Sequence, residues 1–453
     1  MNGYGLVLSG GGAKGSYEVG VWKAIEELDI PICAITGTSI GALNGAMLVQ
    51  GDIELLELAW STLSVEHIIN VRKDIWETEK IYERHMTPFK FFKNTINGDG
   101  LDISPLTNLL REYIDEYRIR NSPIDLGIIT FSLTDRKPLQ IFKDEMPKEH
   151  IVDYLVASAC FPAFKPIEID NKRYIDGGFY DNIPIAPLVE KGIKDIIVVD
   201  ISGGFTGVPV VQRRDKLEDY SDCNITVIEN TQDLGGTLEI DPQRSRENIK
   251  IGYMDALKTF DILKGKKYYI VPTLDEDTNT TSPYNICLNE LQDYLGVDSK
   301  LILYKMMKTI YHYMDKDTPV DSSFIVAMAE ITAEELGVDR YKVYTLKDLN
   351  ESIFIAYEHM LSSLEYNEYV ERIASAISED DDKPSMKSNR TLLSKIRLDR
   401  KYLPIYLYNA RAEAEKDIRF KRLTYLTYPK TAIASIYLYI LLHNKNCIWD
   451  STS

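Results

Sequence analysis

The chain has 453 residues and a formal net charge of −17, with 69 aspartates and glutamates against 52 lysines and arginines. This length exceeds one ordinary hydrophobic core, so two domains are expected, and the acidic balance argues against nucleic acid as a partner. The five cysteines are scattered and lack metal-type spacing, which favours a reducing, cytoplasmic compartment. No signal peptide is expected, because a strand pattern starts at the N-terminus, and no apolar run reaches the ~20 residues of a membrane span.

The first predicted elements are a strand, a glycine loop and a helix. Residues 4–9 form a short apolar run, the sequence Gly-Gly-Gly-Ala-Lys-Gly follows at residues 10–15, and apolar residues then recur at helical spacing over 17–28. Consecutive glycines at a helix N-terminus present backbone N–H groups to an anion or to the oxyanion of a reaction intermediate. Lys14 adds positive charge beside this loop.

Two nucleotide-binding interpretations of the loop are weaker. Gly10, Gly12 and Gly15 satisfy the dinucleotide pattern GxGxxG, but a dinucleotide site also needs an acidic residue at the end of the second strand. That strand is followed here by Thr-Gly-Thr-Ser at residues 36–39. A phosphate-binding P-loop needs glycine before its lysine and serine or threonine after it, whereas alanine precedes Lys14 and glycine follows it.

A serine lies between the second strand and the second helix. Residues 32–36 predict a buried strand, residues 42–49 predict a helix, and Ser39 is at the centre of Gly-Thr-Ser-Ile-Gly. A serine on a tight strand-to-helix turn has its hydroxyl pushed outward, and Gly37 and Gly41 provide the clearance that such a turn needs. The pattern indicates a nucleophilic serine, with a serine in an ordinary glycine-rich loop as the alternative.

The third motif is an aspartate followed by two glycines, Asp176-Gly177-Gly178, which comes directly after a short strand pattern. Its carboxylate can point into a site, although this sequence is also common in ordinary turns. None of the six histidines has the turn and small-residue context typical of a catalytic triad, so a triad is open but unsupported. A dyad in which Asp176 accepts the Ser39 proton directly is the simpler arrangement.

Together these motifs resemble the patatin-like phospholipases. The likeness spans about residues 1–272 and is carried by residues 10–15, 37–41, 157–164, 176–178, 234–238 and 244–253. It implies a lipid acyl hydrolase with Ser39 as nucleophile, Asp176 as base, and no metal or other cofactor. It also implies an oxyanion loop and a set of supporting residues. The loop glycines are Gly10, Gly11 and Gly12, and the supporting residues are Lys14, Gly15, Gly37, Gly41, Gly177 and Gly178.

The other patterns in this region predict an α/β fold with a mostly parallel central sheet and helices on both faces. Strand patterns lie at residues 125–133, 139–142, 165–169, 193–201, 224–229 and 267–271, and helix patterns at 52–63, 149–158 and 245–263. A segment at residues 64–122, which contains Trp76, His85 and Phe89, is expected to be helical and to cover part of the site.

A second, mainly helical domain of unknown role is expected over residues 282–453, after the acyl hydrolase domain at 1–272 and a polar linker at 275–281. Its helix patterns lie at residues 284–295, 301–314, 324–336 and 346–377.

Residues 383–430 of this region hold 13 lysines and arginines against four aspartates and glutamates, and an apolar stretch follows at 431–442. One interpretation is peripheral membrane contact through residues 383–442. The other is a core helix, which the 12-residue length of the apolar stretch favours.

The sequence thus predicts a cytoplasmic serine hydrolase that cleaves ester bonds of phospholipids or other acyl lipids. Its expected partner is the lipid substrate, with no nucleic acid. Two alternatives stay open. One is acyl transfer to an acceptor other than water, and the other is a lipid-binding or regulatory module without turnover.

Overall fold

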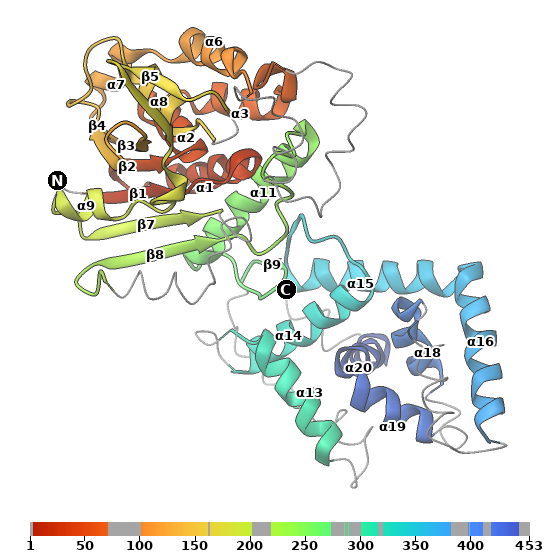
Figure 1. Cartoon of the computed structure of the whole chain (residues 1–453). Helices are drawn as coiled ribbons and strands as arrows, with labels where there is room; N and C mark the ends of the chain where they lie inside the picture. The colour runs from red at the N-terminus through yellow and green to blue at the C-terminus, as the bar shows by residue number, and fades with distance from the viewer. Residues whose placement is uncertain are drawn as a thin grey trace. The chain divides into compact units, whose positions relative to one another are not determined.

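The computed structural model describes residues 3–70, 101–161, 164–201, 219–272, 285, 289, 300–315, 320–381, 397, 399–410 and 418–443. The chain divides into two compact units, Met1–Phe260 and Asp261–Ser453 (Figure 1). The predicted covering segment around Trp76, His85 and Phe89 lies outside the described residues, as does the linker at 275–281. The assignment of a hydrolase domain to 1–272 and a second domain to 282–453 stays a prediction.

The first unit is built on an eight-stranded sheet with the order β5-β6-β3-β2-β1-β7-β8, in which β4 also pairs with β3. The strands β3, β2, β1, β7 and β8 run parallel to one another, whereas β4 and β6 pair antiparallel with β3, and β5 pairs antiparallel with β6. The sheet is therefore mixed and mostly parallel, as the sequence predicts. Its strands are β1 (Tyr4–Leu8), β2 (Ile32–Thr38), β3 (Asp125–Ser132), β4 (Lys137–Phe142), β5 (Ile167–Ile169), β6 (Lys172–Asp176), β7 (Asp195–Asp200) and β8 (Asn224–Glu229).

The helices of the first unit follow the predicted order. They are η1 (Gly12–Gly15), α1 (Ser16–Glu27), α2 (Ile40–Gln50), α3 (Ile53–Thr62), η2 (Val65–His67), α6 (Ser104–Tyr113), α7 (Glu116–Asn121), α8 (Ile151–Ser158), η3 (Gly177–Phe179), α9 (Ala186–Glu190) and α11 (Pro242–Thr259). Helix α11 packs along α1 (Figure 1). The predicted helix at 245–263 thus exists but begins and ends a few residues earlier.

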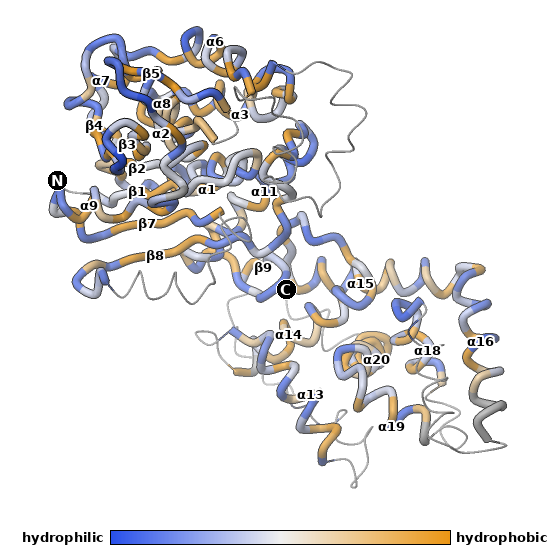
Figure 2. The backbone as a smooth tube through the Cα atoms, viewed as in Figure 1, coloured by the Kyte–Doolittle hydropathy of each residue, from blue (hydrophilic) through white to orange (hydrophobic). Residues whose placement is uncertain are grey.

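Alternate residues of the central strands face opposite helical layers, because successive side chains of a strand point to opposite faces. On one face, Val7 and Ala34 share a buried cluster with Leu188 of α9. On the other face, α2 approaches so closely that a Cβ atom on Gly45 would lie 3.1 Å from the side chain of Ile35. The apolar colouring of β7 in Figure 2 is typical of a strand buried in this way. The predicted covering of both faces is confirmed.

The predicted strand at 267–271 does not extend this sheet. Residues Tyr269–Ile270 form β9, which pairs in parallel with β10 (Val343–Tyr344) inside the second unit. The buried carboxylate of Glu330 fixes the preceding loop, because it accepts three consecutive backbone N–H groups at 2.7–2.9 Å. The donors are Lys266, Lys267 and Tyr268. Contacts with residues more than sixty positions away therefore decide where this strand pairs.

The second unit is mainly helical, as predicted. Its helices are α13 (Lys300–Tyr313), α14 (Val320–Glu335), α15 (Leu346–Leu361), α16 (Leu364–Asp381), η4 (Arg400–Tyr402), α18 (Leu403–Asn409), α19 (Ile418–Thr427) and α20 (Pro429–His443). The single helix expected at 346–377 is instead two. The first ends at Leu361, and the Ser363 hydroxyl accepts the Tyr366 N–H at 3.2 Å in the first turn of the second.

Helix α20 lies at the centre of the second unit, where α13, α14, α18 and α19 pack around it (Figure 1). Ile433, Ile436 and Ile440 are fully buried. The apolar stretch at 431–442 is therefore a core helix, which is the second of the two interpretations above. Among the described residues, no helix is both long enough and apolar enough to cross a membrane. Peripheral membrane contact stays a prediction.

Candidate functional site

Ser39 occupies a strained turn between β2 and α2. Its backbone has φ 54° and ψ −124°, a region that non-glycine residues rarely adopt and that costs on the order of 1–3 kcal/mol. Strand β2 ends at Thr38 and helix α2 begins at Ile40, so the serine is the only residue between them. This is the strand-turn-helix context in which a serine hydroxyl is held outward as a nucleophile.

The glycines on either side of Ser39 are required by close backbone approach. A Cβ atom on Gly37 would lie 2.4 Å from the carbonyl group of Gly41. A Cβ atom on Gly41 would lie 2.3 Å from the carbonyl oxygen of Leu8 in β1. Both separations are far shorter than a nonbonded contact, so any larger residue would displace the turn. The structure thus gives a physical reason for the small residues two positions before and after the serine.

Asp176 is the last residue of β6, which pairs antiparallel with β3. Its carboxylate is 5% exposed and accepts the backbone N–H of Gly178 at 2.7 Å. Its own N–H donates to the carbonyl oxygen of Cys160 at 2.8 Å. A Cβ atom on Gly177 would lie 2.6 Å from the Ile129 carbonyl oxygen, so the turn passes directly over β3. These contacts fix the carboxylate at the end of the strand.

Burial raises the pKa of the Asp176 carboxyl from its usual value near 4 to about 6. Hydrogen bonding from the Ser39 hydroxyl and from the Gly178 N–H lowers the pKa and so opposes part of this shift. The two side chains that the sequence predicts as a dyad are therefore brought together. At pH 7 the carboxyl is mostly ionised, and it accepts a proton more readily than an ordinary aspartate does.

The glycine loop lies against Ser39. A Cβ atom on Gly10 would lie 3.3 Å from the Ser39 Cβ, and one on Gly12, which has φ +60°, would lie 2.2 Å from the carbonyl oxygen of Thr237. The N–H of Gly10 donates to Asn182, whereas the N–H groups of Gly11 and Gly12 have no hydrogen-bond partner among the described residues. Two adjacent donors beside a serine hydroxyl can stabilise an oxyanion.

The remaining predicted support residues also lie near this turn. Lys14 is buried within η1, directly after the glycine loop. The carbonyl oxygen of Gly15 accepts a hydrogen bond from the Asn44 side chain of α2 at 2.9 Å. Asn44 also donates to the buried Glu18 at 2.7 Å and accepts from the Trp60 indole at 3.1 Å. This network joins the N-terminal ends of α1 and α2.

Two further residues, Ser158 and Asn182, position the site, and no sequence pattern predicts a role for either. The Ser158 hydroxyl accepts the Ser39 N–H at 2.9 Å and donates to the Ile129 carbonyl oxygen at 2.6 Å. The Asn182 side chain donates to the Gly10 carbonyl oxygen at 3.0 Å. Ser158 lies within residues 157–164, which carry the family likeness, so the sequence marks the segment as part of the domain but does not indicate what Ser158 does. Asn182, six residues after Asp176, had no such signal.

No described contact brings a histidine to the candidate dyad. His67 caps η2 through Ser64, His150 pairs with Asp153 at 2.9 Å, and His443 stacks on Tyr439. His85 lies outside the described residues. Within the described part of the chain, no group of three or more histidine, cysteine, aspartate or glutamate side chains is placed to hold a metal ion.

Residues 6–189 match the family model of the patatin-like phospholipases. Among curated proteins, a lysophospholipase NTE1 of Cryptococcus neoformans is 28% identical to the chain over 197 residues. This alignment covers 44% of this chain and 11% of the relative. The lysophospholipase NTE1 of Saccharomyces cerevisiae is 23% identical to the chain over 276 residues. This second alignment covers 60% of this chain and 15% of the relative. The chain therefore spans less than a fifth of the length of these relatives.

Two solved structures of bacterial proteins also align along most of the chain. VipD from Legionella pneumophila has 16% identity and a TM-score of 0.34, with 98% of this chain and 92% of VipD covered. The type III effector ExoU has 13% identity and a TM-score of 0.30, with 99% of this chain and 80% of ExoU covered. The fold assignment rests on the sheet topology and not on these two alignments.

Proposed function

We propose that this protein, in which residues 6–189 form a patatin-like phospholipase domain, hydrolyses carboxylic esters of lipids with Ser39 as nucleophile and Asp176 as base. The observation that carries the proposal is the strained Ser39 turn beside a buried carboxyl whose pKa is raised to about 6. A serine needs an adjacent base of suitable proton affinity to become a nucleophile at neutral pH.

In the acylation step, the Ser39 Oγ forms a bond to the ester carbonyl carbon while its proton passes to the Asp176 carboxylate. The carbonyl oxygen becomes an oxyanion, and the N–H groups of Gly11 and Gly12 are free to donate to it. The intermediate then collapses, the bond to the leaving alcohol breaks, and the alcohol oxygen takes the proton from Asp176. Ser39 now carries the acyl group, and Asp176 is ionised again.

In the deacylation step, a water oxygen attacks the acyl carbon and gives its proton to Asp176. The second tetrahedral intermediate uses the same two N–H donors of the glycine loop. When it collapses, the Ser39 Oγ leaves and recovers the proton from Asp176, and the fatty acid departs. A single carboxyl thus acts as base and then as acid in each half of the cycle, which a pKa near neutrality favours.

We propose phospholipids or lysophospholipids as the substrate class. The support is the family model and the lysophospholipase name of the curated relatives, which belongs to those much longer proteins. Asp176 is buried away from water, which suits an ester delivered from a lipid phase. Water is the proposed acyl acceptor.

A fluorophosphonate probe and a lipid extract test the proposal together. The wild type should react with the probe and release free fatty acid, whereas Ser39→Ala should do neither, because loss of an activated serine removes several orders of magnitude in rate. The exposed-serine variant Ser362→Ala serves as a matched control and should behave as the wild type. Mass spectrometry would reveal a transferase if acyl groups appeared on another lipid. It would reveal a non-catalytic module if lipids bound without turnover. Full turnover by Ser39→Ala would refute the mechanism.

A further inference from the structure

The outer side of α13 displays large apolar and aromatic side chains in water. Leu301 is 61% exposed, Tyr304 63% and Tyr311 58%. The exposed Lys308 lies between the two tyrosines, and the spacing 301, 304, 308 and 311 places all four on one face of the helix. The opposite face of α13 is buried in the core of the second unit. Its exposed face therefore has no packing partner among the described residues.

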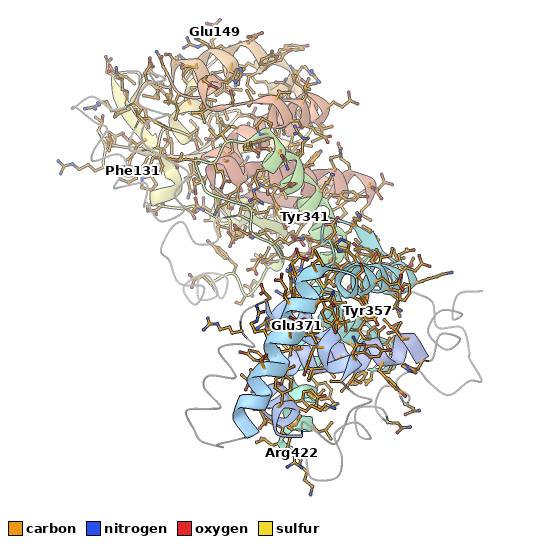
Figure 3. All side chains as sticks on the ribbon, turned by 90° about the vertical axis from the view of Figure 1, so that its right-hand side faces the viewer. Phe131, Glu149, Tyr341, Tyr357, Glu371 and Arg422 are labelled. Atoms are coloured by element: carbon orange, nitrogen blue, oxygen red, sulfur yellow. The ribbon has the colours of Figure 1, made fainter. Side chains whose placement is uncertain are left out.

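Helix α19 packs beside α13, and both helices carry positive charge. The Lys305 side chain of α13 donates to the Leu426 carbonyl oxygen of α19 at 2.9 Å. Arg422 is exposed one helical turn before Leu426, and its side chain extends from the lower end of the second unit in Figure 3. Neither helix contains a single aspartate or glutamate, although acidic residues outnumber basic ones in the chain, 69 to 52.

Two exposed positive charges of these helices have no ion-pair partner in the described part of the chain. Lys308 and Arg422 form no ion pair with any described residue. By contrast, Lys430 and Arg340 of the same unit pair with Glu334. We call the exposed, unpaired set Leu301, Tyr304, Lys308, Tyr311 and Arg422 the α13–α19 surface. It combines apolar side chains, tyrosines and uncompensated positive charge.

We propose that the α13–α19 surface binds the face of an anionic lipid membrane. Tyrosine is favoured at the membrane–water boundary because one end of its ring is apolar and the other is polar. Basic side chains beside it are attracted to anionic headgroups. The choice of a lipid surface rests in part on the proposed function, since a lipid hydrolase must reach a membrane. The contact differs from an anchor through residues 431–442, because that stretch is buried in α20.

A nucleic acid is the less suitable occupant. Aromatic and basic residues together also bind single strands, but such grooves track a long phosphate backbone with many positive charges. The net charge of −17 repels both a nucleic acid and an anionic membrane outside this small surface, but only the membrane offers an apolar phase that can offset the repulsion. The aliphatic Leu301, at 61% exposure, has a natural partner in the acyl boundary of a membrane and none in a nucleic acid.

The test is co-sedimentation of the full chain with phosphatidylcholine vesicles that contain phosphatidylserine, at low and high salt. The variant Lys308→Glu/Arg422→Glu should bind at least 25-fold less, at about fivefold for each basic residue removed from an anionic surface. The variant Leu301→Ser/Tyr304→Ser should also bind less, and its loss should persist at high salt, because salt screens only the charges. The control Lys347→Glu removes an exposed lysine from α15 and should bind as the wild type.

Each outcome is decisive. Equal binding by Lys308→Glu/Arg422→Glu and Lys347→Glu would overturn the proposal, and so would a loss of oligonucleotide binding larger than the loss of vesicle binding. Vesicle binding is measured in Ser39→Ala as well, so that it does not depend on turnover. A protein that binds vesicles without hydrolysing esters would refute the proposed function and leave the surface intact. A protein that hydrolyses a short soluble ester but does not bind vesicles would refute the membrane-binding surface and leave the proposed function intact.

Discussion

Asn182 binds both polar groups of Gly10. Its backbone carbonyl oxygen accepts the Gly10 N–H at 3.2 Å, and its side-chain amide donates to the Gly10 carbonyl oxygen at 3.0 Å. Its Oδ1 atom faces the aspartate turn, where a Cβ atom on Gly178 would lie only 2.8 Å away. One side chain therefore contacts both the glycine loop and the turn that carries Asp176. The separation of these two parts depends on it.

Replacement of Asn182 should slow catalysis without abolishing it. In Asn182→Ala, the Gly10 carbonyl oxygen loses its donor, and we expect kcat for a short ester to fall about 10- to 100-fold with little change in KM. Asn182→Asp should act differently, because a second carboxylate near Asp176 raises the pKa of Asp176 further. The rise of kcat/KM with pH should then shift to higher pH, a change that a merely structural role would not produce.

A suitable control is Asn121→Ala, which also removes one amide-to-carbonyl hydrogen bond, to Tyr117 at 2.8 Å, but at an exposed position. Steady-state kinetics over pH 5–9 and denaturant unfolding would be measured for all three variants. An Asn182→Ala enzyme with the kcat of the Asn121→Ala control would show that Asn182 does not position the loop.

Loss of the Ser158 hydroxyl should lower both the stability of the protein and the reactivity of Ser39. Ser158→Ala leaves the part-buried Ser39 N–H without its 2.9 Å acceptor and the buried Ile129 carbonyl oxygen without its donor, and an unsatisfied buried polar group costs about 1–3 kcal/mol. We expect a lower denaturation midpoint together with slower reaction of Ser39 with a fluorophosphonate probe. The control Ser435→Ala removes an equally buried hydroxyl that only donates to the Ala432 carbonyl oxygen within α20. Equal stability and equal labelling of the two variants would contradict the prediction.

The fold of the first unit could be predicted because its signals are local. The strand patterns of β3, β4 and β8 are each readable within fewer than ten residues. The turn at Ser39 was also readable, since close approach at Gly37 and Gly41 leaves room only for glycine. Whether Ser39 and Asp176 act as a dyad stays a prediction that kinetics must test.

The parts that could not be predicted depend on contacts between distant residues. Ser158 binds a residue 119 positions away and Asn182 one that is 172 positions away, so no local pattern points to either bond. The same holds for β9, whose partner β10 lies more than seventy residues later. The burial of α20 was ambiguous for a different reason. A helix that is apolar on all sides suits either a core or a membrane, and only its short length favoured the core before its neighbours were known.

A larger residue at Gly12 should damage both stability and catalysis. Gly12 has φ +60°, and a Cβ atom there would lie 2.2 Å from the Thr237 carbonyl oxygen. Gly192 has φ +80° but no atom within 4 Å of such a Cβ. Both alanine variants carry the cost of positive φ, about 1 kcal/mol. Only Gly12→Ala should lose further stability and most of its kcat. Thermal unfolding and ester hydrolysis compare the two, and indistinguishable variants would show that the loop tolerates displacement.

The titration of Asp176 should make both stability and activity depend on pH. Its pKa is about 6 in the folded protein and near 4 when unfolded, so between these values the folded state binds more protons and stability falls as pH rises. Asp176→Asn removes this loss. We therefore expect the variant to be inactive. Its free energy of unfolding should exceed that of the wild type by about 1–3 kcal/mol at pH 8, and the two proteins should be equally stable below pH 4. For the wild type, kcat/KM should rise with pH through an inflection near pH 6, because the base must be ionised. Denaturant unfolding of both proteins at pH 4 and pH 8 measures the first effect. If Asp176→Asn were instead less stable at pH 8, the buried carboxylate would be a stabilising group and not a strained base.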